Sequence, residues 1–331
     1  MRSKSLLLFG LVIVFALQAC MKGEKISPHQ PKPIDVYVGG FTIASNGNFV
    51  ASYWKNGVAT VFGDSSLNSV VTSIVVSSTD VYMSGFTRQS LGNAVACYWK
   101  NGTIMRLSDG STETRATGIA ISGTDVYVSG TIGTIQSTAV YWKNTNQITL
   151  GNNSSASSAS AIEVNGNDIY VAGFSDNNHA GYWKNGKDTI LSTADVGNCF
   201  DILINGNDIY LAGFVGSTGG ATYWKNGTAV TLTQNGSALM ASGIAVNGTG
   251  IFISGKDSHG PYGAYWKNGV LTKFDQGTLV NDIAANESDV YLAGVLTNAI
   301  PRKNNAVYWK NNTMIVLPKY GEANSIAIVT R

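Results

Sequence analysis

Short runs of alternating apolar and polar residues, separated by polar turns, make up most of this chain. Between positions 160 and 191 the runs are SAIEVN, DIYVAGF, AGYWKN and DTIL, at 160–165, 168–174, 180–185 and 188–191. Alternation with a period of two is typical of β-strands with one buried face. The third and fourth runs are usually joined by Lys-Asn-Gly, and Asn-Gly supplies the positive φ angles that a two-residue hairpin needs. The pattern predicts four antiparallel strands joined by hairpins.

This four-strand pattern is repeated seven times. Each third strand carries a Tyr-Trp-Lys-Asn motif, and the intervals between successive tryptophans are 45, 43, 41, 41, 42 and 43 residues. The motif tryptophans are Trp54, Trp99, Trp142, Trp183, Trp224, Trp266 and Trp309. Six copies begin the second strand with Asp-(Val/Ile)-Tyr, whereas the sixth copy has Gly-Ile-Phe at 250–252. A period of 40 to 45 residues with several short strands per repeat is typical of β-propeller blades.

The two ends of the repeat region divide one unit between them. The region begins with a second strand, from Ile34, and ends with a first strand at 324–329. Pairing these two segments would complete the first unit and remove two exposed sheet edges at once. We therefore expect an all-β fold: a seven-bladed β-propeller with four antiparallel strands per blade, closed by the C-terminal strand on the N-terminal one.

The first 33 residues do not fit the repeat. Two basic residues, the apolar run LLLFGLVIVFAL and LQAC, which ends at Cys20, resemble a bacterial lipoprotein signal. The resemblance implies a signal peptide at 1–19, a lipidated Cys20 with a flexible tether at 20–33, and a propeller at 34–331. It also implies a lipid-anchored protein of the bacterial cell envelope, at the outer membrane. A plain secretory signal or an uncleaved anchor is the alternative, although the run is short for a membrane span.

The repeats themselves resemble those of bacterial seven-bladed β-propeller lipoproteins of the SBBP type and, more distantly, kelch repeats. The resemblance covers 34–331 and implies a propeller that recognises partners outside the cell. The double glycine of kelch repeats occurs only at Gly39 and Gly40, so the partners of kelch proteins cannot be carried over.

Composition narrows the classes of function. Charged residues make up 13% of the chain, about half the roughly 25% of ordinary soluble domains. From position 34 onward, 17 basic and 19 acidic side chains give a net charge of −2, so the basic surface of nucleic-acid-binding proteins is absent. Cys97 and Cys199 lie several units apart, and we expect two buried free thiols. No cofactor motif is present, and we expect a monomer.

The repeated aromatic and charged residues have a structural explanation. Neighbouring residues on a strand point to opposite faces, so Tyr182 and Trp183 should pack into the two interfaces that flank their blade, and the other Tyr-Trp pairs likewise. Asp168 starts the second strand where Lys184 ends the antiparallel third strand, which predicts an ion pair at the blade rim in every copy but the sixth.

The remaining connections vary in length and content. Those after the second and fourth strands leave from one end of the blades, which we interpret as a recognition face. Its residues outside the repeat pattern gather between the sixth, seventh and first copies and are candidates for ligand binding; they are Tyr262, Tyr320, His259, Arg302 and Lys303. They could equally be ordinary exposed loop residues.

Three carboxylates interrupt the otherwise small and apolar first strands. Asp201, Asp282 and Glu163 are candidates for the mouth of the central channel, as ligands of a cation or as hydrated acids. The chain has three histidines and none of the HExxH, P-loop, GxSxG or zinc-site motifs, so we expect neither a metal site nor a catalytic residue. We favour a non-catalytic module that binds a protein or glycan through the variable face. The alternatives are a carbohydrate-active enzyme using the channel-mouth carboxylates, or a purely structural envelope protein.

Overall fold

The computed structural model describes residues 32–89, 91–150, 155–175, 178–192, 195–216, 220–232, 239–257, 262–298, 300 and 303–331. The proposed signal peptide and most of the tether, with Cys20, lie outside these residues. Ile34–Arg331 forms one compact unit. Its described residues contain 27 strands and no helix, so the prediction of an all-β fold is confirmed.

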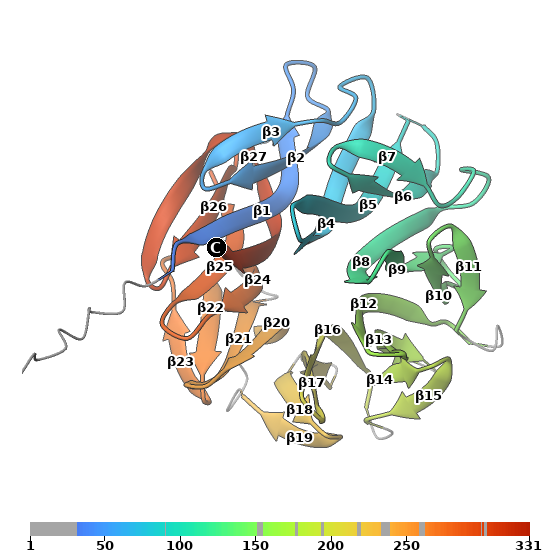
Figure 1. The fold of residues 1–331 in the computed structure, drawn as a ribbon, viewed down its shortest axis with the longest axis vertical. Helices are drawn as coiled ribbons and strands as arrows, with labels where there is room; N and C mark the ends of the chain where they lie inside the picture. Colours follow the sequence, from blue (N-terminus) through green and yellow to red (C-terminus); the bar gives the residue numbers. More distant parts are fainter. Residues whose placement is uncertain are drawn as a thin grey trace, which may run out of the picture. The chain divides into compact units, whose positions relative to one another are not determined.

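Six of the strands begin a repeat and lie nearest the centre of this unit (Figure 1). These inner strands are β4 (Asn68–Ser77), β8 (Thr114–Ser122), β12 (Ser158–Asn165), β16 (Gly197–Asn205), β20 (Leu239–Asn247) and β24 (Thr278–Ala285). The second strands are β1 (Ile34–Ile43), β5 (Asp80–Arg88), β9 (Asp125–Ile132), β13 (Asp168–Ser175), β17 (Asp208–Val215), β21 (Gly250–Asp257) and β25 (Val290–Leu296).

The third and fourth strands follow outward. The third strands, which carry the tryptophans, are β2 (Phe49–Lys55), β6 (Ala94–Lys100), β10 (Thr138–Lys143), β14 (His179–Lys184), β18 (Gly220–Lys225), β22 (Gly263–Lys267) and β26 (Asn305–Lys310). The outer strands are β3 (Val58–Val61), β7 (Thr103–Arg106), β11 (Asn146–Thr149), β15 (Lys187–Ile190), β19 (Thr228–Thr231) and β23 (Val270–Lys273). In the fourth copy each observed strand agrees with its predicted range to within two residues.

The last strand, β27 (Thr313–Thr330), serves two sheets. Its first part pairs with β26, from Lys310↔Thr313 to Val307↔Val316. Its second part pairs antiparallel with β1, from Ile34↔Thr330 to Thr42↔Gly321. The predicted pairing of 324–329 with the strand that begins at Ile34 is therefore present. As a result, the topology comprises five four-stranded antiparallel sheets and one seven-stranded sheet, ordered β24-β25-β26-β27-β1-β2-β3, in a propeller-like arrangement.

The core lies between neighbouring sheets. All seven motif tryptophans are buried, each at most 2% exposed. Trp183 packs with Tyr127 and Ala139 of the preceding sheet, whereas Tyr182 packs with Leu211 and Trp224 of the following one. The predicted alternation of the Tyr-Trp pair between two interfaces is confirmed. Cys97 and Cys199 are buried free thiols, as expected, and burial raises the pKa of both.

The rim ion pairs are also confirmed. Lys184 Nζ lies 2.7 Å from Asp168 Oδ2, and five other copies have the equivalent pair. The motif asparagine completes the network, because the Asn185 side-chain amide donates to Asp168 Oδ1 and its oxygen accepts from the Ile169 N–H. In the sixth copy Lys267 has no such acid, although it lies over the Phe252 ring just as Lys184 lies over the Tyr170 ring.

Candidate functional site

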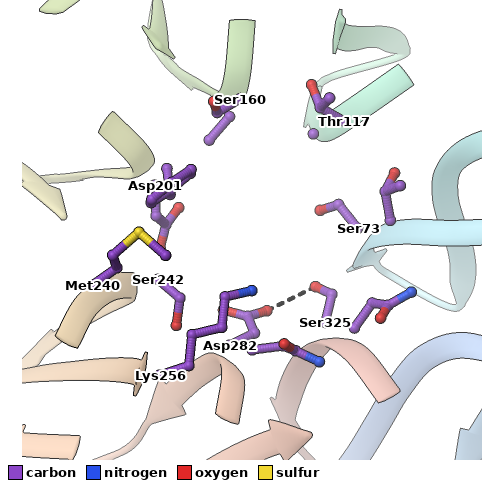
Figure 2. Close-up of a pocket in the computed structure, with 15 residues that line it drawn as sticks. Ser73, Thr117, Ser160, Asp201, Met240, Ser242, Lys256, Asp282 and Ser325 are labelled. Atoms are coloured by element: carbon purple, nitrogen blue, oxygen red, sulfur yellow. Dashed lines mark hydrogen bonds between the residues drawn. The ribbon is translucent and has the colours of Figure 1, made fainter. Parts of the chain in front are cut away.

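A pocket of about 400 Å³ lies where the inner strands converge, and we call it the central pocket (Figure 2). Its lining runs from Thr72 and Ser73 on β4 around to Asn324 and Ser325 on β27. Met240, near the start of β20, and Lys256, near the end of β21, also line it. Because inner strands start and second strands end at the variable connections, the pocket lies toward the predicted recognition face.

A β-bulge in every inner strand builds this pocket. The register shifts between Val71 and Ser73 on β4, for example, so that Thr72 has no partner on β5, and six equivalent shifts occur. An extra residue of this kind redirects its side chain out of the regular ladder. The bulge residues are Thr72, Thr117, Ser160, Phe200, Ser242, Asn281 and Asn324.

Five of the polar bulge residues donate a hydrogen bond to the next inner segment around the pocket. Thr72 Oγ1 donates to the Ala116 carbonyl at 3.0 Å, and Asn324 Nδ2 donates to the Val71 carbonyl at 2.8 Å. Thr117, Ser242 and Asn281 make equivalent bonds to the following inner strand. Phe200 interrupts this belt, since a phenyl ring cannot donate such a bond; its ring stacks at 5.8 Å on Phe214 of the same sheet.

Asp201 and Asp282, predicted at the channel mouth, both line the pocket. Asp201 accepts the N–H of Ile202 and, at 2.8 Å, that of Ile244 on the next inner strand. Asp282 accepts the N–H of Ile283 and Ile326 and the Ser325 hydroxyl. Both carboxylates thus bond a backbone N–H of the next inner segment, on β20 for Asp201 and on β27 for Asp282, in addition to lining the pocket.

Electrostatics favour the neutral form of these acids. Burial, followed by the charge of Asp282, raises the pKa of Asp201 despite its two backbone N–H bonds. Burial likewise raises the pKa of Asp282. A carboxyl group held partly neutral can donate as well as accept a hydrogen bond, which widens the range of ligand groups that the pocket could bind.

Glu163, the third predicted carboxylate, does not line the pocket. It lies three residues after the Ser160 bulge on β12, opposite Tyr170, and burial raises its pKa to about 7. Two of the three acids, Asp201 and Asp282, therefore line the same pocket. Among the described residues, no group of three or more His, Cys, Asp or Glu side chains could hold a metal ion.

The candidate loop residues are only partly described. Tyr262 is 38% exposed just before β22, and Tyr320 is 46% exposed on β27, opposite Asn305. Lys303 is exposed as well, whereas His259 and Arg302 lie outside the described residues. Within the described part of the chain, no hydrogen bond or ring contact joins Tyr262, Tyr320 and Lys303.

Of the residues that line the pocket, sequence reasoning named only Asp201 and Asp282. Among those that it missed, Phe200, Met240 and Lys256 depart most from the small and polar character of the wall. A signal for two of them was present. Phe200 stands where the other six copies have a hydroxyl or amide, and Lys256 stands where the others have phenylalanine, threonine or valine. The sequence alone does not show that these two positions face one cavity, because the bulges that redirect the side chains are visible only in the structure.

Comparison with known proteins adds information about the fold only. No protein-family model matches the chain, and no curated protein matches it. A crystal structure of a nidogen/laminin complex is similar, with a TM-score of 0.46 and 10% identity, over 89% of this chain and 98% of that chain. A Mycobacterium tuberculosis puromycin-hydrolyzing peptidase is similar with a TM-score of 0.55 and 10% identity.

The match to the peptidase covers 86% of this chain and 52% of that one, so this chain spans about half the length of the peptidase. At this identity the likeness shows a shared arrangement of strands and extends to no activity. Across the described residues, no helix is long and apolar enough to cross a membrane.

Proposed function

We propose that this protein is a recognition module of the bacterial cell envelope that binds a glycan or protein at its variable face, with the central pocket as the principal site. The observation that carries the proposal is the pocket itself. Its volume of about 400 Å³ lies in the range of roughly 300 to 1,000 Å³ typical of ligand sites. Eight of the fifteen residues that line it carry a hydroxyl or amide group, which suits a ligand with hydrogen-bonding groups.

We further infer a seven-bladed propeller closed by β27. Three features support this: β27 pairs with both β26 and β1, it contacts the inner strand β4, and the Tyr-Trp-Lys-Asn motif occurs seven times. A closed ring places the seven bulges around one axis, which accounts for a single pocket with contributions from every repeat.

Lipid anchoring at Cys20, with placement at the outer membrane, is part of the same proposal and rests on the sequence of the first 20 residues. The tether joins the propeller at Ile34, where β1 starts. Second strands start at the end of the blades opposite to the variable connections. The tether therefore enters the propeller at the end opposite to the variable connections.

The test is a binding screen of the protein from residue 34 against envelope glycans and envelope proteins, with a pocket-blocking variant. Ser73 lines the pocket and its hydroxyl makes no hydrogen bond within the described residues, so Ser73→Trp should fill the cavity without removing a structural contact. Binding that is lost in Ser73→Trp and kept in the Tyr262→Ala/Tyr320→Ala variant supports the pocket. The reverse result would place recognition on the loops, and no binding at all would favour a purely structural protein.

One observation favours a second candidate function, a carbohydrate-active enzyme. Asp201 and Asp282 lie in the pocket with raised pKa values, as a general acid requires. Turnover of an oligosaccharide that disappears in both Asp201→Asn and Asp282→Asn would establish this activity in place of simple binding.

A further inference from the structure

The residues that depart from the repeat gather on one side of the central pocket. Phe200 and Asp201 come from β16, Met240 from β20, and Lys256 from β21, so two adjacent sheets supply them all. Figure 2 shows Asp201, Met240 and Lys256 together, with Ser73 and Thr117 across the cavity. Most repeated residues of this protein are explained by packing between sheets. Residues that differ from the repeat and line one cavity therefore indicate a role in ligand binding.

Phe200 and Met240 supply an apolar surface within an otherwise polar pocket. Both side chains line the cavity and are only partly buried, so part of their apolar surface is accessible to a ligand. The Phe200 ring is held in place by Phe214. An aromatic ring presented in this way can pack against the C–H face of a sugar ring, as aromatic side chains do with flat or puckered ligands.

Lys256 supplies a positive charge without a close partner. Within the described residues its ammonium has no ion pair within 4 Å and no hydrogen bond, and Figure 2 shows its side chain reaching toward the middle of the pocket. Burial lowers the pKa of Lys256, and the charge of Glu322 opposes this. A half-buried ammonium in this setting would gain from an anionic group on the ligand.

The inner segments that follow around the pocket, on β24, β27 and β4, offer acceptors for hydroxyl groups. Asn281 and Asn324 each use the side-chain NH₂ group to bond a neighbouring carbonyl, which leaves the amide oxygen to accept. Ser73 adds a hydroxyl that makes no bond within the described part of the chain. A set of hydroxyl-binding groups beside an apolar ring matches a pyranose, whose C–H groups form an apolar face and whose hydroxyls surround its edge.

We propose that the central pocket binds an acidic sugar residue, such as a hexuronate, with its ring on Phe200 and Met240, its carboxylate at Lys256 and its hydroxyls toward Asn281, Asn324 and Ser73. The inference deepens the proposed function and depends on it. A pocket of about 400 Å³ admits one or two such rings, so the pocket would bind the terminal residues of an acidic glycan.

Isothermal titration with glucuronate- and galacturonate-terminated oligosaccharides, and with glucose- and galactose-terminated oligosaccharides of equal length, tests the inference. The native protein should prefer the acidic forms. Lys256→Gln should reduce affinity for the acidic forms about tenfold, as expected for one lost charge-assisted bond, and leave the neutral forms unchanged. Phe200→Leu should weaken both classes together.

Lys273→Gln on the outer strand β23 is the matched control, since it removes an exposed positive charge remote from the pocket, and it should change nothing. Thermal melts confirm that each variant is folded. Equal affinity for acidic and neutral sugars, or an unchanged preference in Lys256→Gln, would overturn the acidic-sugar assignment while the pocket remains a binding site. If a ligand from the screen loses its binding in Ser73→Trp but no sugar competes with it, the pocket binds a different class of ligand. If Ser73→Trp changes the binding of no ligand, the proposed function itself is overturned.

Discussion

At the scale of single residues, the bulges explain a glycine present in every second strand. A Cβ atom on Gly213 would lie 1.9 Å from the carbonyl oxygen of Asn198, which the bulge of β16 pushes toward it. Gly40, Gly85, Gly173 and Gly294 meet a carbonyl of their inner strand at the same distance. These glycines are required for the close approach of two backbones, and thereby for the pocket that the bulges form.

We predict that Gly213→Ala strongly destabilises the protein. All three nearest atoms to the new Cβ belong to the backbone of Asn198 and Cys199, so relief requires a shift of β16 and costs about 3 kcal/mol. Chemical denaturation measures the loss. Gly248→Ala is the matched control, because no atom lies within 4 Å of its Cβ position, and it should be close to neutral; equal effects of the two changes would contradict the role of the bulge.

Sequence alone predicted residues whose role follows from alternation. The burial of Trp183, the opposite face for Tyr182 and the pairing of Asp168 with Lys184 all follow from strand period and antiparallel order. The roles of Phe200 and Asp201 could not be predicted in this way, because the one-residue bulge on β16 resets the alternation. A carboxylate that accepts backbone N–H groups from two strands also leaves no local pattern in a sequence.

At the scale of elements, each second and third strand form a hairpin fixed at the rim by Asp, Tyr, Lys and Asn. In the sixth sheet the acid is replaced by Gly250, although Asn268 still accepts the Ile251 N–H and lies over the same turn. Gly250 has a φ of +152°, a conformation that side chains rarely adopt. An aspartate at this position would therefore be strained in the backbone conformation that Gly250 adopts.

Restoring the repeat pattern at this position should be harmful. We predict that Gly250→Asp lowers stability by about 1 to 3 kcal/mol, since its Cβ would lie 2.3 Å from Asn268 Oδ1 and its φ would be strained. The ion pair that it would form with exposed Lys267 is worth less than this. Thermal unfolding checks the sign, with Gly250→Ala separating backbone strain from charge; a gain in stability for Gly250→Asp would show that the turn can relax to the form of the other six copies.

At the scale of the whole molecule, the two ends of the repeat region are joined by side chains as well as by the β1–β27 ladder. Arg331, the last residue, donates from Nε to Asp35 Oδ2 at 2.9 Å and from its guanidinium to the other oxygen. Lys55 and Asn56 contact the same carboxylate. The division of one unit between the two ends was visible in the sequence, whereas this carboxylate cluster was not, because Arg331 lies outside the repeat motif.

We predict that Arg331→Ala weakens the junction between the ends in a pH-dependent way. The Arg331 guanidinium, then the Asn56 amide, hold the pKa of Asp35 well below its usual value. A depressed carboxyl pKa contributes stability that is present above the unfolded-state pKa of about 4 and is lost as the pH falls below it. The stability deficit of Arg331→Ala should therefore be full at neutral pH and shrink in acid, and it should also shrink in high salt because the pair is near the surface.

Hydrogen exchange distinguishes a closed ring from an open array of sheets. If the pairing of β1 with β27 closes the ring, Arg331→Ala should first speed hydrogen exchange at the amides of 326–330. Under mildly denaturing conditions it should also lower the protection of distant inner strands such as β12, because separating β1 from β27 exposes two sheet edges. Lys225→Ala removes an equivalent ion pair with Asp208 inside one sheet and should leave 326–330 unaffected. In an open array the sheets would contact only their neighbours, so a loss of protection confined to β27 and β1 would contradict closure and, with it, the single axis on which the central pocket depends.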